Sequence, residues 1–195
     1  MIDKRTTILT IAGSDNTSGA GIQADIKTSC MLGVYCLSAL TTVTSQNSKK
    51  ISKLFNIPNH ILKSQLKASF DEYEINGVKV GLVNNMSTAK VIYDFLNHFK
   101  KKIPIVIDPI LKSTNNRKFC DSDEYRKIHK IFSKLKPIFT PNLYEAKALI
   151  GNSNKKMNIE KIYQLLKQKY NCEFVVTGGD SASDYCIDYI EVDGK

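Results

Sequence analysis

The chain has 195 residues, which is enough for one domain of ordinary size and short for two, since a domain usually holds about 100–200 residues. Hydrophobic residues make up 42% of the chain and charged residues 24%, an ordinary globular composition that excludes wholesale disorder. No apolar run approaches the roughly 18 residues of a membrane span, and the opening MIDKRTTILT lacks the apolar core of a signal peptide. We therefore expect one cytosolic domain, residues 1–195.

The net charge of +9 comes from 28 basic and 19 acidic residues, and its distribution decides what it means. The lysines occur in short, scattered groups without interleaved aromatic residues, and no helix-turn-helix or zinc-finger pattern is present. We expect no nucleic-acid partner. Anionic small molecules such as nucleotides fit this charge equally well.

The cysteines and histidines predict neither a disulfide framework nor a metal site. Five cysteines are an odd number, and none are spaced as CxxC. Three of the thiols stand among apolar neighbours and are predicted to be buried: Cys30, Cys172 and Cys186. The three histidines lie in helical patterns without metal-ligand spacing and are predicted to be at the surface: His60, His98 and His129.

Short β-forming runs alternate with helical periodicities along the chain. Strands are predicted over residues 6–12, 37–43, 78–83, 105–108, 138–140 and 174–177. Helices are predicted over residues 21–32, 58–70, 87–99 with Ser87 as its cap, 125–135, 142–150 and 159–170. This regular alternation is typical of an α/β fold with a mostly parallel sheet and helices on both faces.

Ligands of such folds bind at the carboxyl ends of the strands, and polar motifs occur at those ends here. They are Gly13-Ser14-Asp15, Gln46-Asn47, Gly81, Asp108, Thr140-Pro141-Asn142 and Thr177-Gly178-Gly179. At the end of the chain, CIDYIEV alternates like a strand and runs into the turn pair Asp193-Gly194, after which only Lys195 follows. A hairpin turn without its second strand predicts that the chain is shorter than the fold to which it belongs.

The segment AGSDNTSGAGIQAD, residues 12–25, joins a strand to a helix through three glycines, so its backbone amides can approach a polar ligand. It matches neither GxGxxG nor GxxxxGK[ST], and a purely structural turn is the alternative. The carboxamide of Gln46 can pair with a heterocycle edge through one donor and one acceptor, although loop amides are often simply solvated.

Asn142 and Glu145 stand three residues apart at a predicted helix start, and Asp108 ends a strand. Side chains with this spacing share one helix face, where an amide and a carboxylate can hold hydrated Mg²⁺ beside phosphates. The alternative is an ordinary helix cap in which Glu145 also interacts with the helix dipole.

Taken in order, these motifs resemble the hydroxymethylpyrimidine/phosphomethylpyrimidine kinases of thiamine biosynthesis, which belong to the ribokinase-like superfamily. The segments that carry the resemblance are LTIAGSDNTSGAGIQADIKT, TTVTSQNS, VKVGLV, IVIDPIL, FTPNLYEA and VVTGGD. The resemblance implies phosphorylation of 4-amino-5-hydroxymethyl-2-methylpyrimidine, and then of its phosphate, by ATP with Mg²⁺. The implied partners are the pyrimidine and ATP, and neither nucleic acid nor a membrane is implied. A homodimer is one of the oligomeric states compatible with the resemblance.

By position, the resemblance assigns three groups of site residues. The pyrimidine site would be lined by Gly13, Asp25, Gln46 and Leu82, the last in place of a frequent Met. Nucleotide binding would fall to Asn142, Thr177, Gly178 and Gly179, and the metal to Asp108 and Glu145.

The chain departs from the family pattern in ways that bear on activity. Asn16 replaces a frequent Pro and Ser18 a frequent Gly, which we expect to change loop stiffness more than chemistry. Thr177 stands where the family usually has Lys, so phosphate charge would go uncompensated there, although Thr is common at this strand end elsewhere in the superfamily. The GTGC segment that supplies the family's anion hole and catalytic residue does not occur in the sequence, so no catalytic residue is assigned. Two alternatives follow: a truncated, non-catalytic remnant that at most binds pyrimidine, and a pyridoxal-type kinase of the same superfamily.

Overall fold

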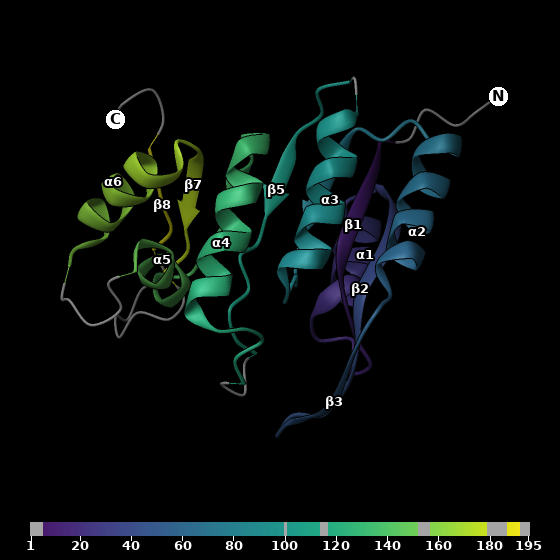
Figure 1. The fold of residues 1–195 in the computed structure, drawn as a ribbon, viewed down its shortest axis with the longest axis horizontal. Coiled ribbons are helices and arrows are strands. Elements are labelled where there is room, and N and C mark those ends of the chain that lie inside the picture. Colours follow the sequence, from purple (N-terminus) through teal and green to yellow (C-terminus); the bar gives the residue numbers. More distant parts are fainter. Residues whose placement is uncertain (1–5, 100, 114–116, 152–156, 179–186, 192–195) are drawn as a thin grey trace.

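A computed structural model describes residues 6–99, 101–113, 117–151, 157–178 and 187–191. An eight-stranded sheet with the order β3-β2-β1-β4-β5-β6-β7-β8 runs through the molecule (Figure 1). The strands are β1 (Thr7–Asp15), β2 (Tyr35–Gln46), β3 (Ile51–Asn56), β4 (Gly77–Val80), β5 (Ile105–Ile107), β6 (Ile138–Phe139), β7 (Glu173–Val176) and β8 (Tyr189–Ile190). The α-helices are α1 (Gly21–Met31), α2 (Asn59–Glu72), α3 (Met86–His98), α4 (Ser122–Phe132), α5 (Leu143–Ile150) and α6 (Ile159–Tyr170), and a 3₁₀ turn, η1 (Ser133–Leu135), follows α4.

The six predicted strands are present and pair in parallel, which confirms the α/β expectation. Strand β3, which was not predicted from the sequence, pairs antiparallel with β2 and forms one edge of the sheet. Its run ISKLFN carries three polar residues and shows no clean alternation, so its pairing with β2 defines it as a strand. Strand β8 pairs antiparallel with β7 at the other edge, within the segment predicted to alternate. The turn pair Asp193-Gly194 lies outside the described residues.

Strand β1 pairs with β2 on one side and β4 on the other, so the strand order reverses at β1. In open parallel sheets a crevice forms at such a reversal, outside the carboxyl ends of the strands. Those ends lie along the lower edge of the sheet in Figure 1, where the β2–β3 hairpin also projects.

The helices cover both faces of the sheet, but unevenly. Helix α1 packs on β1 and β2 and lies behind the sheet in Figure 1. Helices α2 to α6 form a row on the other side, in which each helix contacts the next. None of the helices in the described part of the chain is long and apolar enough to span a bilayer.

Helix ends follow local sequence signals, with one correction. The cap of α3 is Asn85, whose side chain accepts from the Thr88 amide, and not Ser87 as predicted. Both residues are good caps, but the helix begins one residue before Ser87, at Met86. At the end of α5, Gly151 adopts φ +89, the left-handed conformation that favours glycine after a helix.

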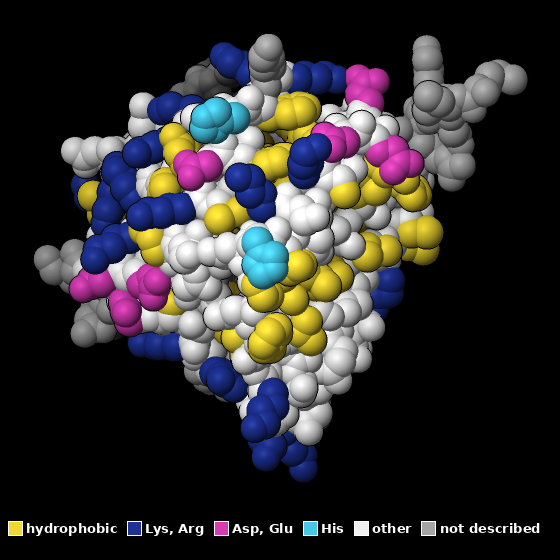
Figure 2. All heavy atoms as spheres, turned by 45° about the vertical axis from the view of Figure 1, so that its right-hand side comes forward, with side chains coloured by type: hydrophobic (Ala, Val, Ile, Leu, Met, Phe, Trp, Pro, Cys, Tyr) yellow, Lys and Arg dark blue, Asp and Glu magenta, His cyan; other side chains and the backbone are white. Residues whose placement is uncertain are grey.

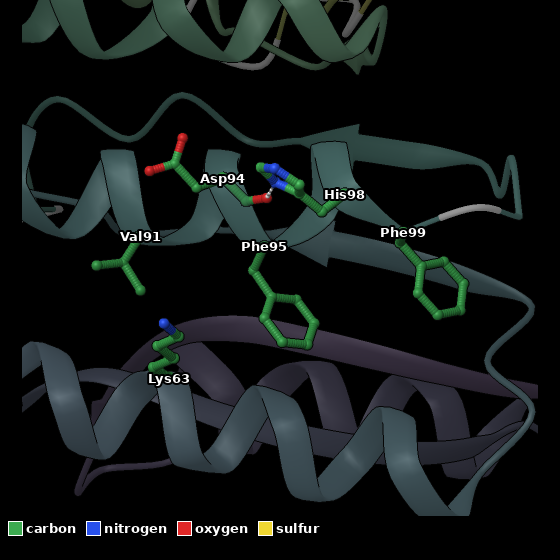
Figure 3. A pocket seen from close by; sticks show the side chains of 6 residues that line it. All are labelled: Lys63, Val91, Asp94, Phe95, His98 and Phe99. Carbon is green, nitrogen blue, oxygen red and sulfur yellow. Dashed lines mark hydrogen bonds between the residues drawn. The ribbon is translucent and has the colours of Figure 1, made fainter.

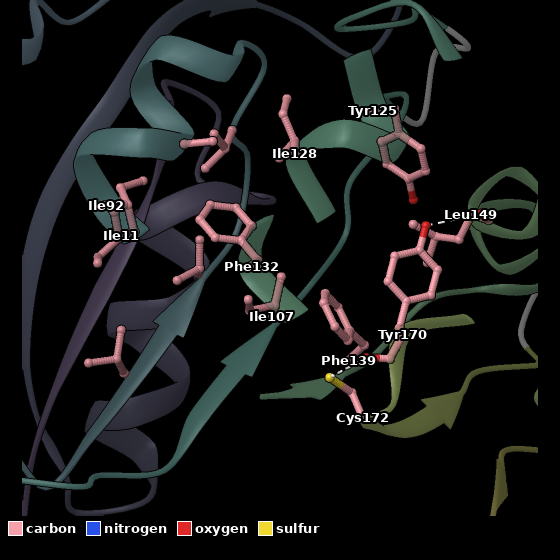
Figure 4. Packing of buried hydrophobic residues seen from close by; sticks show 14 of the residues in the cluster. Ile11, Ile92, Ile107, Tyr125, Ile128, Phe132, Phe139, Leu149, Tyr170 and Cys172 are labelled. Atoms are coloured by element: carbon pink, nitrogen blue, oxygen red, sulfur yellow. Dashed lines mark hydrogen bonds between the residues drawn. The ribbon is translucent and has the colours of Figure 1, made fainter. Parts of the chain in front are cut away.

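The core fills the space between the sheet and the row of helices (Figure 4). Ile11, Ile92 and Ile107 bring strands β1 and β5 against α3. Phe139 stacks on Phe174 with ring centroids 5.3 Å apart, which joins neighbouring strands β6 and β7 beneath the helices.

His129 belongs to this core and contradicts the prediction of a surface histidine. Its side chain is 4% exposed and lies against the rings of Tyr125, Phe132 and Phe139. Its Nδ1 lies 2.7 Å from the Tyr125 carbonyl oxygen, which satisfies one polar atom. Helical periodicity places the residue on the buried face one turn after Tyr125, and histidine is apolar enough to be accepted there once hydrogen-bonded. His60 and His98 are exposed as predicted.

The cysteine predictions divide. Cys172 is buried as predicted, whereas Cys30 is exposed because its side of α1 faces away from the sheet. Cys186 lies outside the described residues.

Basic side chains on the face in Figure 2 occur in several separate groups, and one group occupies the lower tip of the molecule.

Candidate active site

A cavity of about 850 Å³ opens at the carboxyl edge of the sheet. The ends of β1, β2, β5 and β6 and the segments after β4 and β7 all contribute to its lining. Seven of the residues predicted from the sequence line it together: Gly13, Gln46, Leu82, Asp108, Asn142, Glu145 and Thr177. The crossover at β1 therefore brings distant polar motifs into one cavity, as the topology requires.

Asp15 organises the glycine-rich loop at one end of this cavity. Its carboxylate accepts hydrogen bonds from the backbone amides of Thr17 at 2.8 Å, Gly19 at 3.2 Å and Ala20 at 2.9 Å. Burial would raise the pKa of Asp15, but hydrogen bonds from the Gln46 side chain, Thr17 and Ala20 outweigh it and lower that pKa. The loop is thus held by an ionised carboxylate at its centre.

Two glycines in this loop are required by close approach. A Cβ on Gly21, which has φ +60, would lie 2.3 Å from the carbonyl oxygen of Gly13. A Cβ on Gly13 would lie 2.6 Å from the Thr42 hydroxyl oxygen, which is buried and has no hydrogen-bond partner among the described residues. Any larger residue at either position would push the loop into the cavity or off the sheet.

Gln46 is held in place by Asn16 through two hydrogen bonds. The Gln46 amide donates to Asn16 Oδ1 at 2.7 Å, and Asn16 Nδ2 donates to the Gln46 carbonyl oxygen at 3.0 Å. We expected Asn16 to affect mainly the stiffness of its own loop. The structure shows that it also ties that loop to the end of β2, next to the predicted pyrimidine-binding side chain.

Lys79 connects two of the predicted carboxylates. Its Nζ lies 3.1 Å from both carboxylate oxygens of Asp25 and 4.0 Å from Asp108 Oδ2. Asp25 also accepts from the Thr10 hydroxyl at 2.6 Å. Lys79 and Asp108 line the cavity, whereas Asp25 stands behind Lys79 and is not part of the lining. Burial raises the pKa of Asp108, the Lys79 ammonium opposes this, and the Asp25 charge adds to the rise.

Leu82 forms part of the apolar wall expected at the pyrimidine end. It is 6% exposed, and its carbonyl oxygen accepts from the buried Thr41 hydroxyl at 2.7 Å. This bond anchors the segment after β4 to β2 and holds the Leu82 side chain beside Gly13.

Asn142 and Glu145 form a reciprocal capping box at the start of α5. Asn142 Oδ1 accepts from the Glu145 amide at 2.9 Å, and Glu145 Oε2 accepts from the Asn142 amide at 3.1 Å. The Glu145 side chain, 6% exposed, also accepts from the Leu111 amide at 3.3 Å and so fixes the loop after β5. The structural alternative to a metal role is therefore present in the same residues that line the cavity.

The described residues include no group of three or more carboxylate, histidine or cysteine side chains that would form a complete metal site. Asp108 and Glu145 nevertheless line one cavity, and Asp108 is 37% exposed. Mg²⁺ usually binds through one or two carboxylates together with water and substrate phosphates. This pair of oxygen donors fits that chemistry.

Thr177 and Gly178 have different surroundings at the end of β7. Thr177 lines the cavity, and its amide donates to the Pro141 carbonyl oxygen at 2.9 Å. Gly178 is not in the lining, and a Cβ there would lie 2.1 Å from the carbonyl oxygen of Ile187. Close packing against the segment before β8 therefore explains why this position is a glycine. Gly179 lies outside the described residues.

Two charged residues of the cavity lining, Lys79 and Lys112, were not identified from the sequence, and Asp15, named there only as part of a strand-end motif, was not recognised as the loop anchor. Lys79 did have a signal, because it interrupts the apolar strand VKV, and a charge within such a strand needs a partner. Lys112 had none, since it is one of many lysines outside a regular element.

A smaller hollow of about 420 Å³ lies between α2 and α3 (Figure 3). Its apolar part comes from Val91, Phe95 and Phe99, and Phe95 and Phe99 point toward α2 in the close-up. It lies on the helical face, away from the strand ends and from the predicted site residues.

Comparison with known proteins identifies relatives of this chain in sequence and in structure. The sequence profile of the family described as phosphomethylpyrimidine kinase matches residues 15–195. A hydroxymethylpyrimidine/phosphomethylpyrimidine kinase of Aquifex aeolicus is 35% identical over 192 residues, which cover 96% of this chain and 73% of that protein. The crystal structure of a phosphomethylpyrimidine kinase from Clostridium difficile superposes with a TM-score of 0.83 at 28% identity, covering 96% of this chain and 81% of the other.

A solved structure with a different substrate name is also similar. The ADP complex of a Bacillus subtilis pyridoxal kinase superposes with a TM-score of 0.80 at 26% identity, covering 98% of this chain and 72% of the other. The two structures share one architecture and carry different substrate names, so the substrate has to be argued from the site residues.

Proposed function

The chain belongs to the phosphomethylpyrimidine kinase family, and we propose that it transfers a phosphoryl group from ATP to the hydroxymethyl group of 4-amino-5-hydroxymethyl-2-methylpyrimidine. One observation carries this proposal. A single cavity joins the glycine-rich loop and Gln46 at one end to Asn142, Glu145 and Thr177 at the other. A small heterocycle and a nucleotide can therefore meet within it.

At the pyrimidine end, Gln46 would pair with the edge of the ring through its carboxamide, and Leu82 would pack on the ring face. Asn16 holds the backbone of Gln46, so the carboxamide would be oriented before the ligand arrives. Asp25 would act indirectly, by fixing Lys79 at the floor of the cavity.

At the nucleotide end, Asn142 and Thr177 would line the phosphate path, with Gly178 supporting the strand end behind them. Asp108 and Glu145 would hold Mg²⁺, which neutralises phosphate charge when it is bound with ATP. Phosphoryl transfer depends mainly on positioning and on stabilisation of charge, so the contribution of these residues is to bring the substrate hydroxyl and the terminal phosphate together.

The decisive experiment measures ADP formation by this chain with Mg-ATP, with and without the hydroxymethylpyrimidine, and with pyridoxal in its place. We expect ADP formation that depends on the pyrimidine. Faster turnover with pyridoxal would favour the pyridoxal-type alternative.

A calorimetric titration with the pyrimidine separates the remaining alternative. Pyrimidine binding without ADP formation by a folded chain would identify a non-catalytic remnant, in line with the absence of a GTGC segment from these 195 residues. Absence of both binding and turnover would contradict the proposal as a whole.

A further inference from the structure

We propose that Lys112 supplies the positive charge for the polyphosphate chain of the nucleotide, in the place where Thr177 leaves none. This inference rests on the proposed kinase function, because it assigns a residue to the nucleotide end of the same cavity. Lys112 and Thr177 both line that cavity, together with Asn142 and Glu145.

The position of Lys112 is defined by the loop that carries it. The preceding residue, Leu111, is 1% exposed, and its amide donates to Glu145 Oε1 at 3.3 Å. Lys112 also forms an antiparallel bridge with Lys118, and the Phe119 amide donates to the Leu111 carbonyl oxygen at 3.1 Å. The backbone of Lys112 is thus fixed beside the capping box of α5.

The Lys112 side chain is directed toward α5 by an aromatic ring. Its Nζ lies 4.0 Å from the ring centroid of Tyr144, the second residue of α5. A cation over an aromatic face is attracted to the ring, so a preferred position replaces free rotation. The ring belongs to the same first turn of α5 as Asn142 and Glu145, which line the cavity where phosphates are proposed to lie, while Tyr144 itself is not in that lining.

Position favours Lys112 over Lys79 for this role. Lys79 lies with Asp25 and Asp108, whereas Lys112 directly follows Leu111, whose amide donates to Glu145 at the nucleotide end of the cavity. In the described part of the cavity lining, Lys79 and Lys112 are the two basic side chains, against three carboxylates. A polyphosphate adds further negative charge at the end where Lys112 lies, and a nearby ammonium group stabilises it.

The test compares Lys112→Met with Lys118→Met by calorimetric titration with ATP, ADP and adenosine. Lys118 is on the same loop and carries the same charge, but it is exposed and outside the cavity lining. We expect Lys112→Met to weaken ATP binding by about 10- to 100-fold, ADP binding by less, and adenosine binding hardly at all. Lys118→Met should bind all three as the unmodified chain does.

Three results would overturn the proposal: unchanged ATP affinity in a folded Lys112→Met chain, equal losses for ATP and adenosine, or an equal loss in Lys118→Met. Thermal unfolding of both variants shows whether the chain is folded. A selective loss for the phosphorylated pyrimidine, with ATP unchanged, would assign Lys112 to the substrate phosphate instead and would also overturn it.

These readouts are independent of turnover. A chain that binds ATP through Lys112 but forms no ADP would contradict the kinase proposal alone. A chain with normal turnover and normal ATP affinity in Lys112→Met would contradict only the role of Lys112. An unmodified chain that binds no ATP would contradict both.

Discussion

Asn16 and Gln46 lie 30 positions apart in the chain and share two hydrogen bonds, of 2.7 and 3.0 Å, between the Asn16 side chain and the Gln46 backbone. Asn16 is in the loop after β1, and Gln46 ends β2. The pair therefore links two neighbouring strand ends across the predicted pyrimidine pocket. Asn16, which departs from the family pattern, thus holds Gln46, which matches that pattern.

The first prediction concerns this link. Asn16→Ala removes both hydrogen bonds and should weaken pyrimidine binding by up to roughly 5- to 150-fold, since two bonds of about 0.5–1.5 kcal/mol each are lost. Asn16→Asp keeps the oxygen that accepts from the Gln46 amide and should show a smaller loss. Calorimetric titration with the pyrimidine measures both, and ATP affinity should stay the same. Equal pyrimidine affinity in all three chains would show that the link does not orient Gln46.

The second prediction concerns Gln46 itself. Gln46→Ala removes the carboxamide that is proposed to pair with the ring edge, so pyrimidine binding should weaken far more than ATP binding. The ratio of the two dissociation constants, measured on the same preparation, is the relevant quantity. Similar losses for both ligands would contradict the assigned role.

The third prediction separates the two roles of Glu145. Glu145→Ala removes the reciprocal cap of α5 and the anchor of Leu111, and should lower the free energy of unfolding by about 1–3 kcal/mol. It should also raise the Mg²⁺ concentration needed for half-maximal ADP formation. Glu145→Gln keeps one of the two acceptor oxygens and removes the charge, so it should lose less stability than Glu145→Ala while the Mg²⁺ requirement still rises. An unchanged Mg²⁺ dependence in Glu145→Gln would leave Glu145 with its structural role only.

The fourth prediction concerns pH and the buried His129. Complete burial lowers the pKa of His129 from 6.5 to about 4, while the hydrogen bond to Tyr125 works in the opposite direction. Between these pH values the unfolded chain binds more protons than the folded one. The stability that the buried, neutral His129 contributes is therefore fully present above pH 6.5. As the pH falls toward about 4, this contribution is lost, and the free energy of unfolding decreases by about 3 kcal/mol.

Urea unfolding at a series of pH values tests this dependence. His129→Leu should remove this part of the acid sensitivity, whereas the exposed His60→Leu should keep the slope of the unmodified chain. The same slope in His129→Leu would assign the acid sensitivity to carboxylates instead.

The fifth prediction compares two glycines with similar backbone conformation. Gly21 and Gly33 have φ +60 and +71, but an added Cβ meets the Gly13 carbonyl oxygen at 2.3 Å in the first case and nothing within 4 Å in the second. Gly33→Ala should cost about 1–2 kcal/mol of stability, from backbone strain alone. Gly21→Ala should cost clearly more and should weaken pyrimidine binding. Equal unfolding midpoints in urea would show that the loop moves away from the added methyl group.

The alternation of apolar runs and helical periodicity was sufficient to predict the six parallel strands and the helices between them. Local pattern carries this information because each buried strand and each amphipathic helix needs its own apolar residues. Strand β3 was missed, since its residues carry little strand signal apart from their pairing with β2. His129 was misassigned because a histidine has no fixed place in the burial pattern, and its place in the core depends on the three rings around it.

The site divides in the same way. Residue type and position at strand ends, together with the family resemblance, were enough to name Gly13, Gln46, Asp108 and Glu145 as candidates, because parallel strands bring their carboxyl ends to one edge. Only the tertiary structure showed that Asn16 holds Gln46, that Asp25 contacts Lys79, and that Lys112 stands beside Tyr144. These relationships join residues from different loops and elements, and their distances depend on how helices and loops pack on the sheet, which no local pattern encodes.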